Sequence, residues 1–376
     1  MQIFAFFDSS FGSDEAAWRR LREARPISRQ HFSLNLPSSL GQYDLNRQDQ
    51  VAPIVGLARK AGIDGFVLDL VEADGDYRHA GALLAPFCGS EFGLALRWCN
   101  KSEPLWRDPA DAVRQMEQAE RLVAALRDFP ARRIDGRIPL IVQAPETLAA
   151  PAAQTAMLRM AAERAGLSGL YLIASRAEDQ GRFLSQGFDC LLDPPPQDWH
   201  SCQPSNRASG LDYLEVMAGL RDSVDYLDRF FPYLSFSVSR MAKRDQRGKC
   251  LPLVFGAFHD WLDHPEGGAT HLVASGQRAI DTQLFGMFIE NAMLWTHRNF
   301  SPAERVVFLH SWNCWFDGSQ MEPSLLDGDL VYNTVRAAID RGRYVIRTRG
   351  ESPADIDDLL KERIAVLCRL AGEGAA

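Results

Sequence analysis

Short apolar runs recur along the chain, and most are followed by a longer stretch with helical periodicity. Runs rich in β-branched and aromatic residues predict buried strands, and apolar residues that recur every three to four positions predict helices. The expected strands are Ile3–Phe7, Gly65–Leu70, Gly93–Trp98, Ile138–Gln143, Gly169–Ala174, Asp189–Leu192, Leu253–Phe258 and Val306–Trp312. The expected helices are Val51–Ala61, Pro109–Leu126, Ala152–Ala165, Asp281–Trp295 and Pro353–Leu370. Eight βα units predict a closed barrel of parallel strands.

The expected fold class is α/β, with a single (β/α)8 TIM-like barrel. Strands such as Phe66–Leu70 are continuously hydrophobic, which is typical of parallel strands covered by helices. Gly62 and Gly166 each follow an expected helix, where a left-handed C-cap favours glycine. We expect the barrel to occupy residues 1–350, with a long first βα loop, and a C-terminal helix and tail over residues 351–376 to pack on it.

Composition and charge narrow the classes of function. The chain has 376 residues, of which 46% are hydrophobic, so it can bury a large core. A net charge of -8 argues against binding to nucleic acid, which requires clustered cations. The seven cysteines form no CxxC pair and no zinc-ligand pattern with histidine, so we expect a reducing, cytoplasmic location and no metal.

Two further sequence patterns are absent. No glycine-rich phosphate loop occurs, so we expect no nucleotide cofactor. No apolar run reaches the roughly 18 to 20 residues that a membrane helix needs, so no membrane-spanning segment is expected. The oligomeric state cannot be inferred from the sequence.

Polar and aromatic residues follow the expected strands, at the end of a barrel where reactive groups gather. Aromatic rings stack on the apolar faces of sugars, and amide, carboxylate and imidazole groups bond to their hydroxyls, so this mixture predicts a glycan site. Cleavage of a glycosidic bond also needs two carboxyl groups. Asp317 is one candidate, with Asp69, Asp260 or Asp263 as the other. The remaining candidates for substrate binding are Trp98, Asn100, Gln143, Trp261, His310, Asn313 and Trp315.

Four segments along the chain carry recognisable motifs. The segment His31–Leu70 contains the signature LGQYDL, and His310–Pro323 reads HSWNCWFDGSQMEP. Phe92–Asn100 and Arg137–Val142 lie in order between them. Together these segments resemble the WbsX-type, glycoside hydrolase family 99-like proteins, and the resemblance covers roughly residues 1–345. It implies a barrel like that of endo-acting α-mannosidases, which need no metal, and of glycosyltransferases of polysaccharide and O-antigen synthesis. It also implies that Tyr43 and Glu322 bind substrate.

The eighth-strand motif departs from the family at two positions. Cys314 stands where the first glutamate of Asn-Glu-Trp-Ala-Glu-Gly is found, and Asp317 replaces the second. Aspartate withdraws the carboxylate by one methylene, and a misplacement of about 1 Å can cost about 100-fold in rate.

Three hypotheses remain. The first is a metal-independent, carbohydrate-active enzyme that transfers or hydrolyses glycosyl groups of a cell-surface polysaccharide or oligosaccharide with a carboxylate acid and base. The alternative is a catalytically degenerate glycan-binding protein of a polysaccharide biosynthesis system, which the replacement of glutamate by Cys314 favours. The third is a barrel enzyme for small metabolites, which predicts a phosphate site after the last two strands, with His264–Gly268 as a candidate.

Each candidate residue also has a purely structural explanation. Asp317 with Gly318 can form a turn, Trp312 can belong to the core, Asn313 can bond to loop backbone, and Cys314 can be a small buried residue. Asp69 either faces the mouth or pairs with Arg97, and Tyr43 and Asp44 can anchor the first loop.

Overall fold

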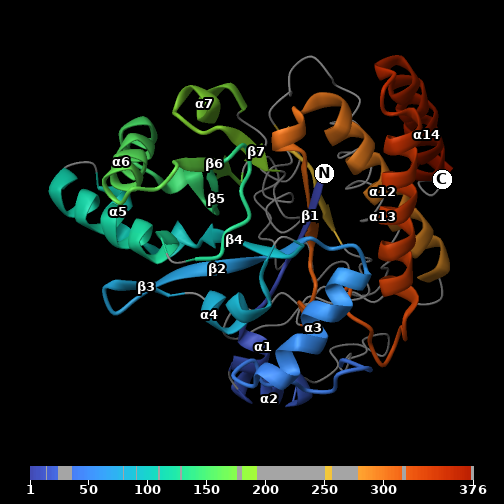
Figure 1. Ribbon diagram of the computed structural model, residues 1–376, viewed down its shortest axis with the longest axis horizontal. Coiled ribbons are helices and arrows are strands. Elements are labelled where there is room, and N and C mark those ends of the chain that lie inside the picture. Colours follow the sequence, from blue (N-terminus) through green and yellow to red (C-terminus); the bar gives the residue numbers. More distant parts are fainter. Residues whose placement is uncertain are drawn as a thin grey trace, which may run out of the picture.

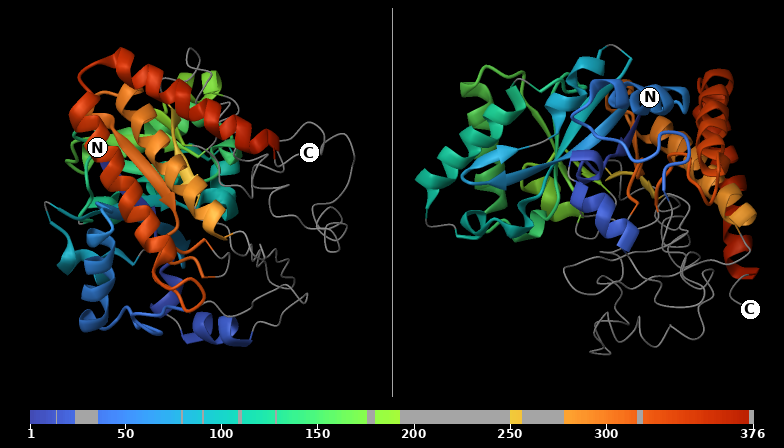
Figure 2. Two further views of the ribbon diagram at one scale, coloured as in Figure 1. Left: turned by 90° about the vertical axis from the view of Figure 1, so that its right-hand side faces the viewer. Right: turned by 90° about the horizontal axis from the view of Figure 1, so that it is seen from below.

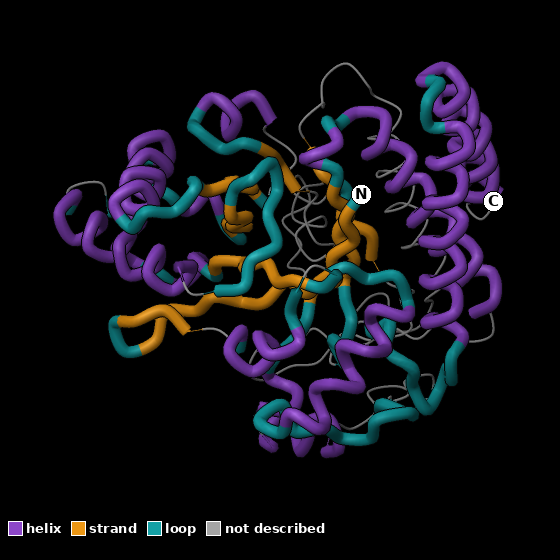
Figure 3. The backbone as a smooth tube through the Cα atoms, in the orientation of Figure 1, coloured by secondary structure: helices purple, strands orange, loops and turns teal. Residues whose placement is uncertain are grey.

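The computed structural model describes residues 1–13, 15–23, 36–78, 80–89, 91–108, 111–127, 129–175, 180–192, 250–255, 278–315 and 319–373. Parallel strands lie at the centre and helices surround them (Figures 1 and 3). The parallel strands are β1 (Gln2–Phe6), β2 (Gly65–Ala73), β4 (Gly93–Trp98), β5 (Ile138–Val142), β6 (Leu170–Ala174), β7 (Cys190–Leu192), β8 (Cys250–Leu251), β9 (Leu253–Phe255) and β10 (Val306–His310).

The ring of strands closes at Pro252. The order is β8-β7-β6-β5-β4-β2-β1-β10-β9, so β8 pairs with β7 and β9 pairs with β10. Only Pro252 separates β8 from β9, and proline has no N–H to contribute to a ladder. Taken as one interrupted strand, β8 and β9 give eight positions in the ring. The expected (β/α)8 TIM-like barrel is therefore confirmed.

The helices follow the expected order with small shifts at their ends. They are α1 (Ser10–Ser13), α2 (Glu15–Glu23), α3 (Gln48–Lys60), α4 (Gly81–Leu84), α5 (Ala112–Arg127), α6 (Pro151–Arg164), α7 (Gln180–Ser185), α12 (Arg278–Asn299), α13 (Leu330–Arg349) and α14 (Pro353–Glu373). Gly62 and Gly166 have φ of 86° and 73°, as the C-cap expectation requires. In the part of the chain that the structure describes, no helix is both long and apolar enough to cross a membrane.

The strand β3 and the long helix α13 are among the elements that were not expected from the sequence. β2 continues past the barrel and turns back into the antiparallel strand β3 (Asp76–Arg78), so the acidic residues after Leu70 lie in a hairpin (Figure 1). The turn contains Asp74 and Gly75, both with positive φ. The helix α13 packs on α12, and α14 also lies against α12, where Arg298 pairs with Asp357 (Figure 2). The division at residue 350 stays a prediction.

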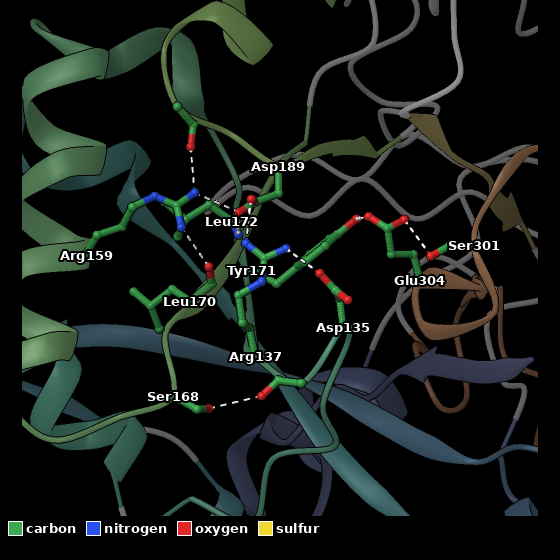
Figure 4. A network of polar contacts seen from close by, with 12 residues as sticks. Asp135, Arg137, Arg159, Ser168, Leu170, Tyr171, Leu172, Asp189, Ser301 and Glu304 are labelled. Carbon is green, nitrogen blue, oxygen red and sulfur yellow. Dashed lines mark hydrogen bonds and ion pairs between the residues drawn. The ribbon is translucent and has the colours of Figure 1, made fainter.

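A network of ion pairs holds the amino-terminal ends of β5, β6 and β7 together (Figure 4). Its centre is Asp189, whose carboxylate accepts hydrogen bonds from Arg137 Nη1 at 2.6 Å, Arg159 Nη2 at 2.7 Å and the Leu172 N–H at 2.8 Å. The Arg137 guanidinium lies 4.8 Å from the ring of Tyr171. Charged hydrogen bonds of this kind are stronger than neutral ones, so we expect them to stabilise the contact between these three strands.

Candidate functional site

An ion pair occupies the carboxyl end of the barrel. Asp69 of β2 and Arg97 of β4 are directly paired in register, so their side chains point to the same side of the sheet. Arg97 Nε and Nη2 donate to the two Asp69 oxygens at 2.7 and 2.9 Å. The Arg97 guanidinium lies 5.0 Å from the ring of Phe6 on β1, although β2 separates β1 from β4. Contact across an intervening strand places these side chains inside the barrel.

Asp69 is the accessible partner of this pair. Its side chain is 41% exposed, whereas that of Arg97 is 21% exposed. Burial alone lowers the pKa of Arg97, but the charge of Asp69 outweighs burial and raises it above the ordinary arginine value. The expectation that Asp69 either faces the mouth or pairs with Arg97 is met in both respects, because the paired carboxylate still reaches solvent.

His310 lies at the end of β10, against the same ring. Its imidazole centroid is 5.7 Å from that of Phe6, and its Nδ1 lies 3.1 Å from the Ser319 hydroxyl oxygen. Gln143 directly follows β5 and is half-buried. Since it lies two positions beyond Ile141, which is paired in register with Arg97, strand alternation puts it on the interior side as well. Asp69, Gln143 and His310 thus lie at the same end of the barrel.

Two thiols flank the ion pair. Cys99 and Cys314 are both close enough to Arg97 to interact with its guanidinium. Burial, followed by the neighbouring Asp69, raises the pKa of the Cys99 thiol to about 12. Cys314 is half-buried, so it is enclosed less completely than a core residue. Its position brings the loop after β10 to the mouth that also receives Asp69.

The loop after β10 folds back on itself and binds the first βα loop. Within it, Ser311 N–H donates to Ser319 C=O at 3.1 Å and Met321 N–H donates to Ser311 C=O at 3.0 Å. Across the two loops, Ser38 N–H donates to Pro323 C=O at 2.9 Å. The Trp18 indole N–H donates to the Tyr43 carbonyl at 3.1 Å. Tyr43 therefore anchors the first loop, as the structural explanation of this residue expects.

Three other candidates have structural roles that the sequence analysis did not assign to them. Trp98 is fully buried, and its indole N–H donates to Glu103 Oε1 at 2.5 Å. Trp315 is 1% exposed, so neither indole offers an open stacking face. Asn100 is also fully buried and bonds to both the N–H and the C=O of Ala144. Each of these side chains is buried, and its expected role in binding substrate stays a prediction.

Other expectations are met or lie outside the described residues. Trp312 is fully buried against Phe66, so it belongs to the core. Asn313 bonds to the backbone N–H and C=O of Asp8, as expected for a residue that satisfies loop backbone. The remaining candidates lie outside the described ranges, namely Asp260, Trp261, Asp263, Asp317 and the segment His264–Gly268. Sequence reasoning missed Glu103, which follows β4 closely, and Phe6, whose apolar strand gave no functional signal.

A hollow of about 520 Å³ opens on the opposite rim, between α3 and α13. Its charged lining is internally paired, since Arg343 binds Asp64 at 2.9 Å and Arg59 binds Glu91. Asp64 also accepts the backbone N–H of Ile3 at 2.8 Å, so its carboxylate serves to join β1 and β2. This hollow is therefore distinct from the candidate site. Within the described residues, no cluster of three or more histidine, cysteine or acidic side chains is arranged to hold a metal.

A family model described as "Glycosyltransferase WbsX" matches residues 5–69 and 96–334. The chain belongs to this family. The matched residues contain β10 and the loop that follows it, as well as Asp69 and Arg97. The WbsX match therefore includes the segments that form the mouth of the barrel.

A curated relative matches most of the WbsX chain in sequence, and solved structures match its fold. The "Uncharacterized protein WxcX" of Xanthomonas campestris pv. campestris is 24% identical over 349 residues, which cover 89% of this chain and 47% of that protein. The chain thus spans about half the length of this curated relative. A "Glycoside hydrolase-like protein" superposes with a TM-score of 0.55 at 14% identity, covering 90% of this chain and 93% of that one.

A second solved structure is a GH99 endo-alpha-mannosidase from Bacteroides thetaiotaomicron, bound to BIS-TRIS-propane. It has a TM-score of 0.53 and 16% identity, and it covers 93% of this chain and 99% of that one. At such identities the likeness establishes the barrel fold alone.

Proposed function

We propose that this WbsX-family protein is an enzyme that transfers or hydrolyses glycosyl groups of a cell-surface polysaccharide or oligosaccharide, using carboxylates and no metal. The observation that carries the proposal is the mouth of the barrel. There an accessible carboxylate, Asp69, is bonded to Arg97, and Arg97 and His310 both contact the ring of Phe6. Aspartate, arginine and histidine can together bond to several sugar hydroxyls.

The proposed chemistry divides the work between two carboxyl groups. Glycosyl transfer passes through a cationic transition state at the sugar ring, and one carboxyl group must protonate the departing oxygen. We assign proton donation to Asp317 and stabilisation of the cationic ring to Asp69, with Asp260 as an alternative partner. The two hydrogen bonds from Arg97 fix the orientation of the Asp69 carboxylate, which such a role requires.

The first experiment is a glycan array probed with the wild-type protein, followed by product analysis for each sugar that binds. Asp317→Asn and Asp69→Asn should retain binding but lower turnover at least 100-fold, because each removes a group that acts in the transition state. Asp74→Asn is the matched control, since Asp74 lies in the hairpin turn at φ 55°, which asparagine tolerates. Full turnover by both mouth variants would remove the two carboxylates from the mechanism.

The second candidate function is glycan binding without catalysis. Cys314 favours it, because the family's glutamate is missing at this position. The array separates the two functions. Binding of a defined glycan with no product, from the wild-type protein and over a range of acceptors, would establish the binding role.

The proposal places the enzyme in cytoplasmic polysaccharide biosynthesis. The described cysteines carry thiols and not disulfides, which suits a reducing compartment; they are Cys88, Cys99, Cys190, Cys250 and Cys314. Fractionation of cells that express the full-length protein tests the location. Turnover measured after treatment with a strong chelator tests the independence from metal. We expect turnover to be unchanged, and a loss of turnover that added metal restores would overturn this part of the proposal.

A further inference from the structure

A chain of buried hydrogen bonds runs from the end of β1 to the turn after β10. The Asp8 N–H donates to Asn313 Oδ1 at 2.8 Å, and Asn313 Nδ2 donates to the Asp8 carbonyl at 2.9 Å and to the Tyr43 hydroxyl oxygen at 3.0 Å. Tyr43 in turn donates its hydroxyl hydrogen to Glu322 Oε2 at 3.2 Å. The Asn313 Nδ2 nitrogen can only donate, so the Tyr43 hydroxyl oxygen accepts from it and the hydroxyl hydrogen is directed to Glu322.

Glu322 is the end of this chain and is enclosed. Its side chain is buried, and its Oε1 has no hydrogen-bond partner. Tyr43 is the titratable group that contacts it, and in the described part of the chain no cation forms an ion pair with it. A single neutral donor compensates a buried negative charge poorly. Burial accordingly raises the pKa of the Glu322 carboxyl to about 8, and the bond from Tyr43 lowers it only in part.

We propose that Glu322 is a positioning residue that works as a neutral carboxylic acid, holding Tyr43 and Asn313 so that the loop bearing Cys314 keeps its place at the barrel mouth. The resemblance implied contact between substrate and Glu322. The structure instead puts two side chains, Tyr43 and Asn313, in a row between Glu322 and the backbone of Asp8. This inference rests on the proposed function only for the statement that the loop serves a glycosyl reaction.

The network makes a definite prediction about pH. When the loop opens, Glu322 reaches water and its pKa returns to the ordinary carboxyl value. Between that value and about 8, the closed form keeps a proton that the open form has lost, so opening becomes more favourable as pH rises. Above about pH 8 both forms are ionised, and the opening equilibrium levels off. Its dependence is at most about tenfold per pH unit within the interval.

Hydrogen exchange measured by mass spectrometry tests this without any substrate. Protection factors, corrected for intrinsic exchange rates, are compared at pH 6, 7, 8 and 9 for peptides that cover residues 36–46 and 311–322. We expect wild-type protection to fall at least tenfold between pH 6 and 8 and then to level off. Glu322→Gln, which stays neutral, should show no such fall. Equal pH dependence in the two proteins, or a flat wild-type profile, overturns the proposal.

Tyrosine variants provide the second test, should Glu322→Gln fail to fold. Tyr43→Phe removes the link and should lower protection of both peptides about five- to tenfold at pH 6. Tyr332→Phe is the matched control, because its hydroxyl is the donor to the Leu57 carbonyl, outside this chain of bonds. If the two peptides have the same protection factors in Tyr43→Phe as in Tyr332→Phe, the proposal is contradicted.

The activity readout separates this proposal from the proposed function. With a glycan substrate in hand, wild-type kcat should decline as pH rises towards about 8 and then level off, because the loop opens over that interval. KM should change little, and Glu322→Gln should lose this decline. If no glycan is ever turned over, the proposed function fails, and the exchange profiles still decide the role of Glu322. If kcat of Glu322→Gln keeps the wild-type decline, the positioning role is refuted.

Discussion

Replacing Asp189 by asparagine tests whether the ion-pair network at the amino-terminal end of the barrel stabilises the fold. The carboxylate accepts from two guanidinium groups and one backbone N–H, and its side chain is 17% exposed. Hydrogen bonds to charged groups contribute about 1.5 to 3 kcal/mol each. After allowance for solvent screening, we expect a loss of about 3 kcal/mol in the free energy of unfolding.

This loss translates into a measurable shift in thermal stability. With an unfolding entropy of about 2.1 cal/mol/K per residue, a chain of 376 residues should lose about 4 °C in Tm for 3 kcal/mol. Scanning calorimetry of the full chain measures the shift. Asp135→Asn is the matched control, because that carboxylate is 49% exposed and binds Arg137 alone at 3.0 Å, so its loss should lower Tm by no more than about 1 °C.

The refuting result is clear. Equal Tm values for Asp189→Asn and Asp135→Asn would mean that the network of Figure 4 contributes nothing beyond exposed pairs. Glycan binding should be unchanged in both variants, because the network lies at the end of the barrel away from Asp69.

Three further predictions concern packing and the mouth. Gly65→Ala should lower stability by about 2 kcal/mol or prevent folding, because an added Cβ would collide with the Gly93 carbonyl oxygen; calorimetry measures this. Arg97→Met should leave the fold intact but lower turnover at least tenfold by releasing Asp69, and undiminished turnover would exclude a role in orientation. Glu103→Gln should lower the free energy of unfolding by about 2 kcal/mol, because the new amide nitrogen cannot accept the hydrogen bonds that the indole of Trp98 and the hydroxyl of Tyr77 donate to the carboxylate. Urea unfolding measures this, and an unchanged free energy would contradict it.

The fold followed from the sequence because its pattern is local. Each expected strand overlaps an observed one, since a buried parallel strand must be apolar along its whole length, as in Val306–His310. β3 was missed because its pairing depends on a turn at Asp74 and Gly75 that continues an existing strand beyond the barrel. The interruption of a strand by Pro252 was also not foreseen, because it matters only once both neighbouring strands are in place.

The candidate site was predicted less completely, because burial at a strand end is decided by distant segments. Asp69 and His310 could be found, since the carboxyl ends of parallel strands meet at one end of a barrel. The enclosure of Trp98 could not, because it depends on Glu103 and on the helix that packs over it. The contact between Tyr43 and Glu322 joins residues 279 positions apart, so no local pattern reports it.

The ion-pair network around Asp189 and the candidate site around Asp69 lie at opposite ends of the barrel. The charged network around Asp189 ties together strand beginnings, while the loops at the other end are joined by neutral bonds such as that from Asn313 to Tyr43. A replacement at position 314 is therefore expected to leave the scaffold that carries it intact. Under the proposed function, such an arrangement would let catalytic side chains be exchanged over evolutionary time without loss of the fold.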